Sequence, residues 1–160
     1  MNLTPSQKTT LKNFINNNAP YNTFPAGPEG SASIAALLNT ADAGPFVVWR
    51  SSVPITEIMN NGFVWDRVDN ATVGQARIWE WMKDQGAINP SKQNIRDGID
   101  AAWPGTPNAT QRTGIYTHCK RNATVLEKLF ATGTGTDVSP ATLVVEGNIS
   151  YAEVQAARES

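Results

Sequence analysis

Cysteine, histidine and long apolar runs are scarce in this sequence. Among its 160 residues one is a cysteine, Cys119, and one is a histidine, His118. A single cysteine excludes an internal disulfide and a zinc site built from several cysteines. No apolar stretch reaches the roughly 18 residues that a membrane span needs, and the first residues lack the basic start and apolar run of a signal peptide. We therefore expect a protein that stays in the compartment where it is made.

Neither sign of charge is in excess. The chain carries 13 Lys and Arg against 14 Asp and Glu, a net charge of −1, with no charge block. This balance disfavours nucleic-acid binding over the whole chain and leaves Lys120-Arg121 as a local basic pair. With 40% hydrophobic and 17% charged residues, the composition is typical of a soluble globular domain with a core of ordinary size.

Residue patterns that carry catalysis are also missing. No P-loop, G-x-S-x-G, H-E-x-x-H or Rossmann fingerprint occurs. His118 and Cys119 are adjacent, and adjacent positions on a helix point about 100° apart, so they cannot form a base and nucleophile pair or chelate one ion. We expect no enzyme, no cofactor and no metal site.

Two predicted helices each carry a pair of carboxylates on one face, and either pair could hold a cation. They are Asp97 with Asp100 and Glu80 with Asp84. Each has a basic neighbour, and a solvated charged face is much the commoner reason for such spacing.

Helix signals, by contrast, are abundant. Capping residues and 3.6-residue periodicity predict helices over residues 5–17, 31–39, 54–60, 70–85 and 92–102. A further segment, Thr106–Thr136, organises the rest: a long helical pattern, a break at Asn122, a short helix ending at Phe130 and a Gly-Thr repeat. The capping box Ser150-x-x-Glu153 predicts a terminal helix. The fold class is therefore mainly α, a small helical bundle.

A minor β element and a C-terminal arm complete the expected architecture. Short strands are predicted near 46–50 and 142–146, and 63–65 is a weaker candidate. Thr132–Thr136 predicts a flexible or extended linker. We therefore divide the chain into a helical domain, 1–131, and a linker with a C-terminal arm, 132–160. The strand in the arm needs a partner, either residues 46–50 or a neighbouring chain.

Tryptophan is the one surplus, with five in the chain. Trp79 and Trp81 are about 200° apart on a helix, so both cannot face one core. One of them is expected to meet another surface, since tryptophan is enriched at interface hot spots; the alternative is that the loop over residues 16–30 covers both.

The C-terminal quarter resembles a known family. The residues that carry the resemblance are the run EKLFATGTGT at 127–136, SPAT at 139–142, Glu146-Gly147, Ser150-Tyr151 and, upstream, Val48-Trp49-Arg50. They are similar to small structural proteins of tailed bacteriophages at the head-to-tail junction, the head-tail connectors or adaptors. The resemblance covers about the last 40 residues, and elsewhere only length and element order.

The resemblance implies a virion protein without catalytic residues. Such subunits are mainly helical, form a ring, usually a dodecamer, beneath the portal protein, and offer a platform to the tail or nozzle, with DNA passing. The protein would be made in the host cytoplasm and end in the virion. Another neck, tail-completion or capsid-associated role is an alternative, as is a small ligand-binding module that uses the tryptophans. The side chains expected at interfaces are Trp79, Trp81, Leu143, Val144, Val145 and Tyr151.

Overall fold

The computed structural model describes all residues from Met1 to Ser160. It is mainly helical, with two two-stranded sheets, which confirms the predicted fold class. The chain divides into two compact units. Unit 1 comprises residues 1–47 and 122–160, and unit 2 comprises residues 48–121. Unit 2 is therefore an insertion between the two segments of unit 1. No helix in the structure has the length and apolar character that crossing a membrane requires.

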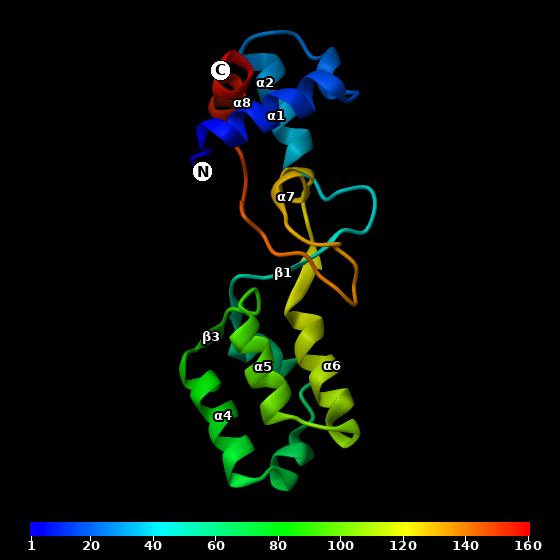
Figure 1. The fold of residues 1–160 in the computed structure, drawn as a ribbon, viewed down its shortest axis with the longest axis vertical. Coiled ribbons are helices and arrows are strands. Elements are labelled where there is room, and N and C mark those ends of the chain that lie inside the picture. The colour runs from blue at the N-terminus through cyan, green and yellow to red at the C-terminus, as the bar shows by residue number, and fades with distance from the viewer. The chain divides into compact units, whose positions relative to one another are not determined.

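Unit 1 is built on helices from both ends of the chain. It contains α1 (Pro5–Asn17), the 3₁₀ turn η1 (Tyr21–Thr23), α2 (Pro28–Leu38), α7 (Val125–Phe130) and α8 (Tyr151–Glu159). The C-terminal helix α8 packs against α1 and α2 (Figure 1). The buried side chains of this core include Leu11, Ile15, Ile34, Leu38, Leu126, Val145, Ile149, Val154 and Ala157.

Capping boxes set the start of three helices in unit 1, as the sequence predicts. Thr4 with Gln7 caps α1, Thr124 with Glu127 caps α7, and Ser150 with Glu153 caps α8. In each box the hydroxyl accepts a hydrogen bond from the third helical amide, and the longer side chain accepts one from the cap amide. Helices of six to 13 residues are marginal alone, so these caps support elements whose apolar faces complete the core.

Unit 2 contains helices from the middle of the chain. In chain order they are α3 (Ile55–Asn60), η2 (Trp65–Asn70), α4 (Val73–Asp84), α5 (Gln93–Ala102), η3 (Thr106–Asn108) and α6 (Ala109–His118). Strands β2 (Val53–Pro54) and β3 (Ala87–Ile88) pair antiparallel. α4 and α5 pack together (Figure 1) over a core that includes Val53, Ile58, Trp79, Ile88, Ile99, Trp103 and Ile115.

The strand predicted at 46–50 is present, but the one predicted at 142–146 is not. β1 (Val47–Trp49) pairs with β4 (Lys120–Asn122). The sequence pattern instead predicts that the helix before β4 continues as far as Arg121. In place of a strand, the C-terminal segment forms an isolated bridge, Thr132 to Thr142, and a hydrogen bond from Ala141 N to Val47 O (2.9 Å). The candidate strand at 63–65 is also absent, because η2 begins at Trp65.

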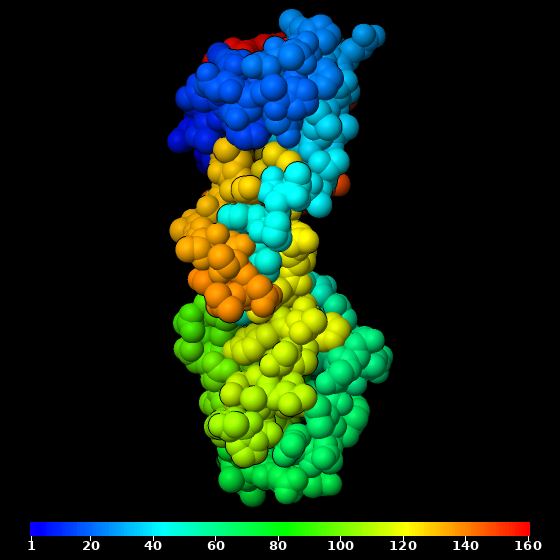
Figure 2. Space-filling view, turned by 90° about the vertical axis from the view of Figure 1, so that its right-hand side faces the viewer, coloured from blue at the N-terminus to red at the C-terminus, as the bar shows by residue number.

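The Gly-Thr repeat is fixed in place rather than acting as a free linker. The amide of Val47 donates to the carbonyl of Gly135 at 2.7 Å. Gly135 has φ +68° and lies so close to Phe46 that a Cβ would come within 2.3 Å of the ring. Figure 2 shows this orange segment against the cyan residues before β1. Glycine is needed because its backbone contacts an aromatic face in a left-handed conformation.

Residues beyond 131 therefore belong to unit 1, and the division of the structure differs from the predicted 1–131 and 132–160. Val145, Ile149, Val154 and Ala157 lie in the same core as α1 and α2. The change in composition after residue 131 predicts a boundary there. In the structure the boundaries lie within β1 and β4, between residues 47 and 48 and between residues 121 and 122.

Three smaller predictions are also corrected. The sequence predicts Asp69 or Asn70 as the cap of the helix over 70–85, but Thr72, with Gln75, caps α4. The spacing of Val73 with Ala76 and Trp79 predicts a buried position, but Val73 is 76% exposed. Gln111, which the spacing places off the apolar stripe of Ile115 and Cys119, is fully buried because its side chain accepts a hydrogen bond from the amide of Val64.

Candidate functional site

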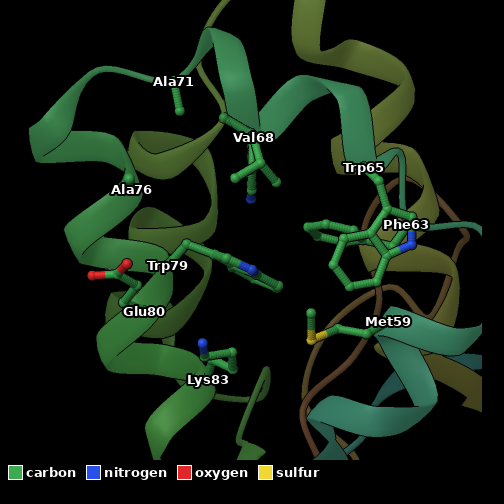
Figure 3. Close-up of a pocket in the computed structure, with 10 residues that line it drawn as sticks. Met59, Phe63, Trp65, Val68, Ala71, Ala76, Trp79, Glu80 and Lys83 are labelled. Carbon is green, nitrogen blue, oxygen red and sulfur yellow. The ribbon is translucent and has the colours of Figure 1, made fainter.

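An aromatic pocket opens on the surface of unit 2. It has a volume of about 140 Å³. η2 and α4 supply most of its wall, and Figure 3 shows the indole of Trp79 directed across it toward Phe63. The lining residues are Met59, Phe63, Trp65, Val68, Ala71, Ala76, Trp79, Glu80, Lys83 and Trp103.

Phe63 is the centre of the aromatic wall. Its ring stacks on Trp79, with centroids 5.4 Å apart and planes 17° apart, and meets Trp65 and Trp103 edge-on at 5.0 and 5.8 Å. Trp79 and Trp103 also meet edge-on at 5.8 Å. Offset-stacked and edge-to-face pairs each contribute about 0.5–1.5 kcal/mol beyond burial, so the wall is formed before any ligand arrives.

Two close approaches hold the loop that carries Phe63 and Trp65. Gly62, at φ +84°, turns the chain after α3, and its carbonyl lies where a Cβ on Gly114 of α6 would come within 2.8 Å. One residue beyond Phe63, the amide of Val64 donates to Gln111 Oε1 at 2.7 Å. The buried amide of Gln111 thus anchors the aromatic segment from α6.

The polar groups at the pocket are mostly donors. Lys83 and Glu80 line its edge as exposed charges, and neither has a hydrogen-bond or ion-pair partner. Trp103 is 2% exposed, and its Nε1–H has no acceptor in the protein. A buried donor without a partner costs about 1–3 kcal/mol and calls for an explanation.

A polar cluster in unit 2 joins Arg50, the residue after β1, to α3 and α6. Arg50 donates from its two terminal guanidinium nitrogens to Glu57, at 2.5 and 3.0 Å, and from one of them to the carbonyl of His118 at 2.9 Å. His118 Nδ1 lies 3.5 Å from Glu57 Oε1. The hydrogen bonds from Arg50 lower the pKa of Glu57, with a smaller contribution from His118.

Cys119 lies beside this cluster but is not placed as a nucleophile. It is fully buried, and burial raises the pKa of its thiol to about 12. A thiol with so high a pKa holds almost no thiolate near neutral pH and reacts slowly. The cluster is therefore arranged to hold the end of α6 against α3.

The carboxylate pairs do not converge on a common point. Asp100 accepts a hydrogen bond from the Tyr116 hydroxyl at 3.0 Å, and Asp97 accepts one from Gln93 at 2.7 Å. No group of three or more His, Cys, Asp or Glu side chains is arranged to hold a metal ion.

The six side chains expected at interfaces lie in different surroundings. Trp79 and Val145 are buried, in the cores of unit 2 and unit 1 respectively, and Leu143 is half-buried. Three remain exposed: Trp81 at 65%, Val144 at 62% and Tyr151 at 53%. Of these six side chains only Trp79 lines the pocket, where it meets Phe63 and two of the other tryptophans, Trp65 and Trp103.

The signal that could have revealed the pocket is the aromatic pair in Phe63-Val64-Trp65, directly after the turn sequence Asn60-Asn61-Gly62. As a strand, this run would present both rings on one face; in the structure both rings line the pocket. Comparisons of the chain with protein-family models, with curated proteins and with solved structures found no match.

Proposed function

We propose that the protein is a structural virion protein of a tailed bacteriophage, a head-tail connector subunit that forms a ring beneath the portal protein and joins it to the tail. The proposal begins with the resemblance of residues 127–151 to that family. These residues run from within α7, through the ordered Gly-Thr segment, to the start of α8, and they supply part of the core of unit 1.

The observation that carries the proposal is the exposure of large apolar side chains on both units. Unit 1 presents Val138, Val144 and Tyr151, which are 94%, 62% and 53% exposed. Unit 2 presents Trp65, Val73 and Trp81, which are 59%, 76% and 65% exposed. Isolated exposed apolar residues are ordinary, but exposed tryptophans are rarer and are enriched at interface hot spots. Burial between subunits of a ring accounts for them.

A contact between unlike surfaces of neighbouring copies is the kind that closes into a ring. The two units supply different apolar surfaces, so a head-to-tail contact can bury one against the other. We therefore infer that each subunit uses one surface toward each neighbour.

Assembly with a portal ring tests the proposal. The full-length protein is analysed by sedimentation velocity and negative-stain electron microscopy, alone and mixed with the portal protein encoded in the same genome. We expect co-sedimentation and a ring of added density on one end of the portal. A protein that stays monomeric and does not bind the portal, or a genome without a portal gene, would overturn the connector proposal.

A further inference from the structure

The aromatic pocket of unit 2 has the size of one aromatic ring. Its volume of about 140 Å³ is close to that of an apolar protein cavity known to hold benzene, about 150 Å³. The walls supply flat faces and ring edges from Phe63, Trp65 and Trp79. A flat apolar group fits such walls better than a branched chain, because it can stack on one ring and meet another edge-on.

The polar groups around the pocket select the charge of the occupant. Figure 3 shows the amine of Lys83 beside Trp79 at the edge of the pocket, while the carboxylate of Glu80 extends away from Phe63 and Trp65. Lys83 has no partner in the protein. Its ammonium group donates hydrogen bonds and accepts none. The complement is an anionic acceptor.

Aromatic walls alone would also suit a quaternary ammonium group. Lys83 argues against that class of ligand, because its positive charge at the edge repels a cation and attracts an anion. Because the Glu80 carboxylate extends away from the rings (Figure 3), Lys83 decides between two ligands that the rings would both accept.

We propose that this pocket is a binding site for a small aromatic carboxylate with a single ring. The ring lies among Phe63, Trp65 and Trp79, and the carboxylate pairs with Lys83. The site lies within unit 2 and shares one residue, Trp65, with the apolar surface of the connector proposal.

The five indole N–H groups of the chain provide the readout. Uniformly ¹⁵N-labelled full-length protein is titrated with benzoate, with benzyl alcohol and with benzylamine, and the indole resonances are followed after assignment by single Trp→Phe variants. Benzoate should move the signals of Trp65, Trp79 and Trp103 at the lowest concentration. Trp49 and Trp81 do not line the pocket and should not move. Equal responses to all three probes, or shifts of all five indoles, would refute the proposal, as would no shift.

Matched variants separate the charge from the cavity. Lys83→Gln should weaken benzoate binding about fivefold, the upper end for one partly exposed ion pair, and leave benzyl alcohol unaffected. Arg77→Gln removes the same charge from an exposed position on α4 outside the pocket and should change neither affinity. Ala76→Leu places three more carbons in the pocket and should reduce binding of both probes. Unchanged benzoate affinity in Lys83→Gln, with a native spectrum, would rule out the assigned role of Lys83.

Discussion

Trp79 and Trp81 are two residues apart on α4 and are 5% and 65% exposed. We predict that Trp79→Ala lowers the free energy of unfolding by about 3–5 kcal/mol, because it empties the centre of the unit 2 core. Trp81→Ala should change it by less than about 0.5 kcal/mol and should weaken ring assembly by about 2 kcal/mol if Trp81 is an interface hot spot. Chemical denaturation measures the first effect and sedimentation the second. A large loss of stability in Trp81→Ala would contradict this assignment.

Gly135 leaves no room for a side chain. We predict that Gly135→Ala destabilises unit 1 by about 2–3 kcal/mol, because a Cβ would meet the Phe46 ring at 2.3 Å and the φ of +68° favours glycine. Gly147→Ala is the control, since Gly147 also has a positive φ, +99°, but nothing lies within 4 Å of its Cβ position. Denaturation followed by far-ultraviolet circular dichroism should separate the two variants by more than 1 kcal/mol, roughly the cost of the clash alone.

Glu57 makes stability depend on pH in the acid range. Its pKa is lower in the folded protein than in the unfolded chain because Arg50 donates two hydrogen bonds to it. Its stabilisation is therefore fully present above the ordinary glutamate pKa of about 4.3 and is lost as the pH falls through the lowered value. Glu57→Gln should flatten the acid limb of the stability profile. Glu80→Gln, at an exposed site without a partner, should leave that limb as in the parent protein.

At the scale of elements, α8 shows how a nine-residue helix depends on its cap. Ser150 Oγ accepts from the Glu153 amide, and the Glu153 carboxylate accepts from the Ser150 amide at 3.0 Å. Ser150→Ala should lower the stability of unit 1 by about 1 kcal/mol. Ser6→Ala makes the same change in α1, where the hydroxyl takes part in no cap, and should be neutral or slightly stabilising because alanine is the better helix former. Equal effects would show that the cap of α8 is unimportant.

Element identity was largely predictable because it depends on local chemistry. The capping boxes and apolar spacings that predicted α1, α7 and α8 are satisfied within a few residues of chain. No strand forms at 142–146 because strand propensity does not supply a partner: the segment meets β1 through Ala141, one residue earlier, and Thr142 bridges to Thr132 instead. The Gly-Thr segment is not the flexible linker that its composition predicts, because contact with Phe46, almost 90 residues earlier in the chain, holds it in place.

The candidate site was only partly predictable for the same reason. The opposite directions of Trp79 and Trp81 follow from helix geometry alone. The pocket, however, needs Trp103 from the end of α5 and Phe63 from the loop after α3 to meet Trp79. That contact depends on the hydrogen bond to Gln111 and on the approach of Gly62 to Gly114. Neither can be predicted from the spacing of apolar residues along the chain.

On the scale of the whole molecule, unit 2 should fold without unit 1. Its two ends lie together, because Arg50 N donates to Cys119 O at 2.9 Å, and its core is made of its own residues. We predict that a fragment of residues 48–121 keeps the near-ultraviolet circular dichroism of packed tryptophan, since all five tryptophans lie within it.

A second fragment, 1–131, provides the comparison. It lacks α8 and the core residues Val145, Ile149 and Val154, so it should keep the tryptophan signal and lose the helicity of unit 1. If instead 48–121 were unfolded and 1–131 fully folded, the chain would be organised as a helical domain with a dispensable arm.

The insertion of unit 2 into unit 1 also determines the order in which the protein can fold during translation. α1 and α2 leave the ribosome first, but the helix that covers them, α8, is at the far end of the chain. The 113 residues from 48 to 160 take roughly 6–23 s to synthesise at 5–20 residues per second. During this time unit 2 can reach its final structure while the apolar faces of α1 and α2 stay uncovered. The segment made first is therefore the last to be completed, and it is where a nascent chain would need a chaperone.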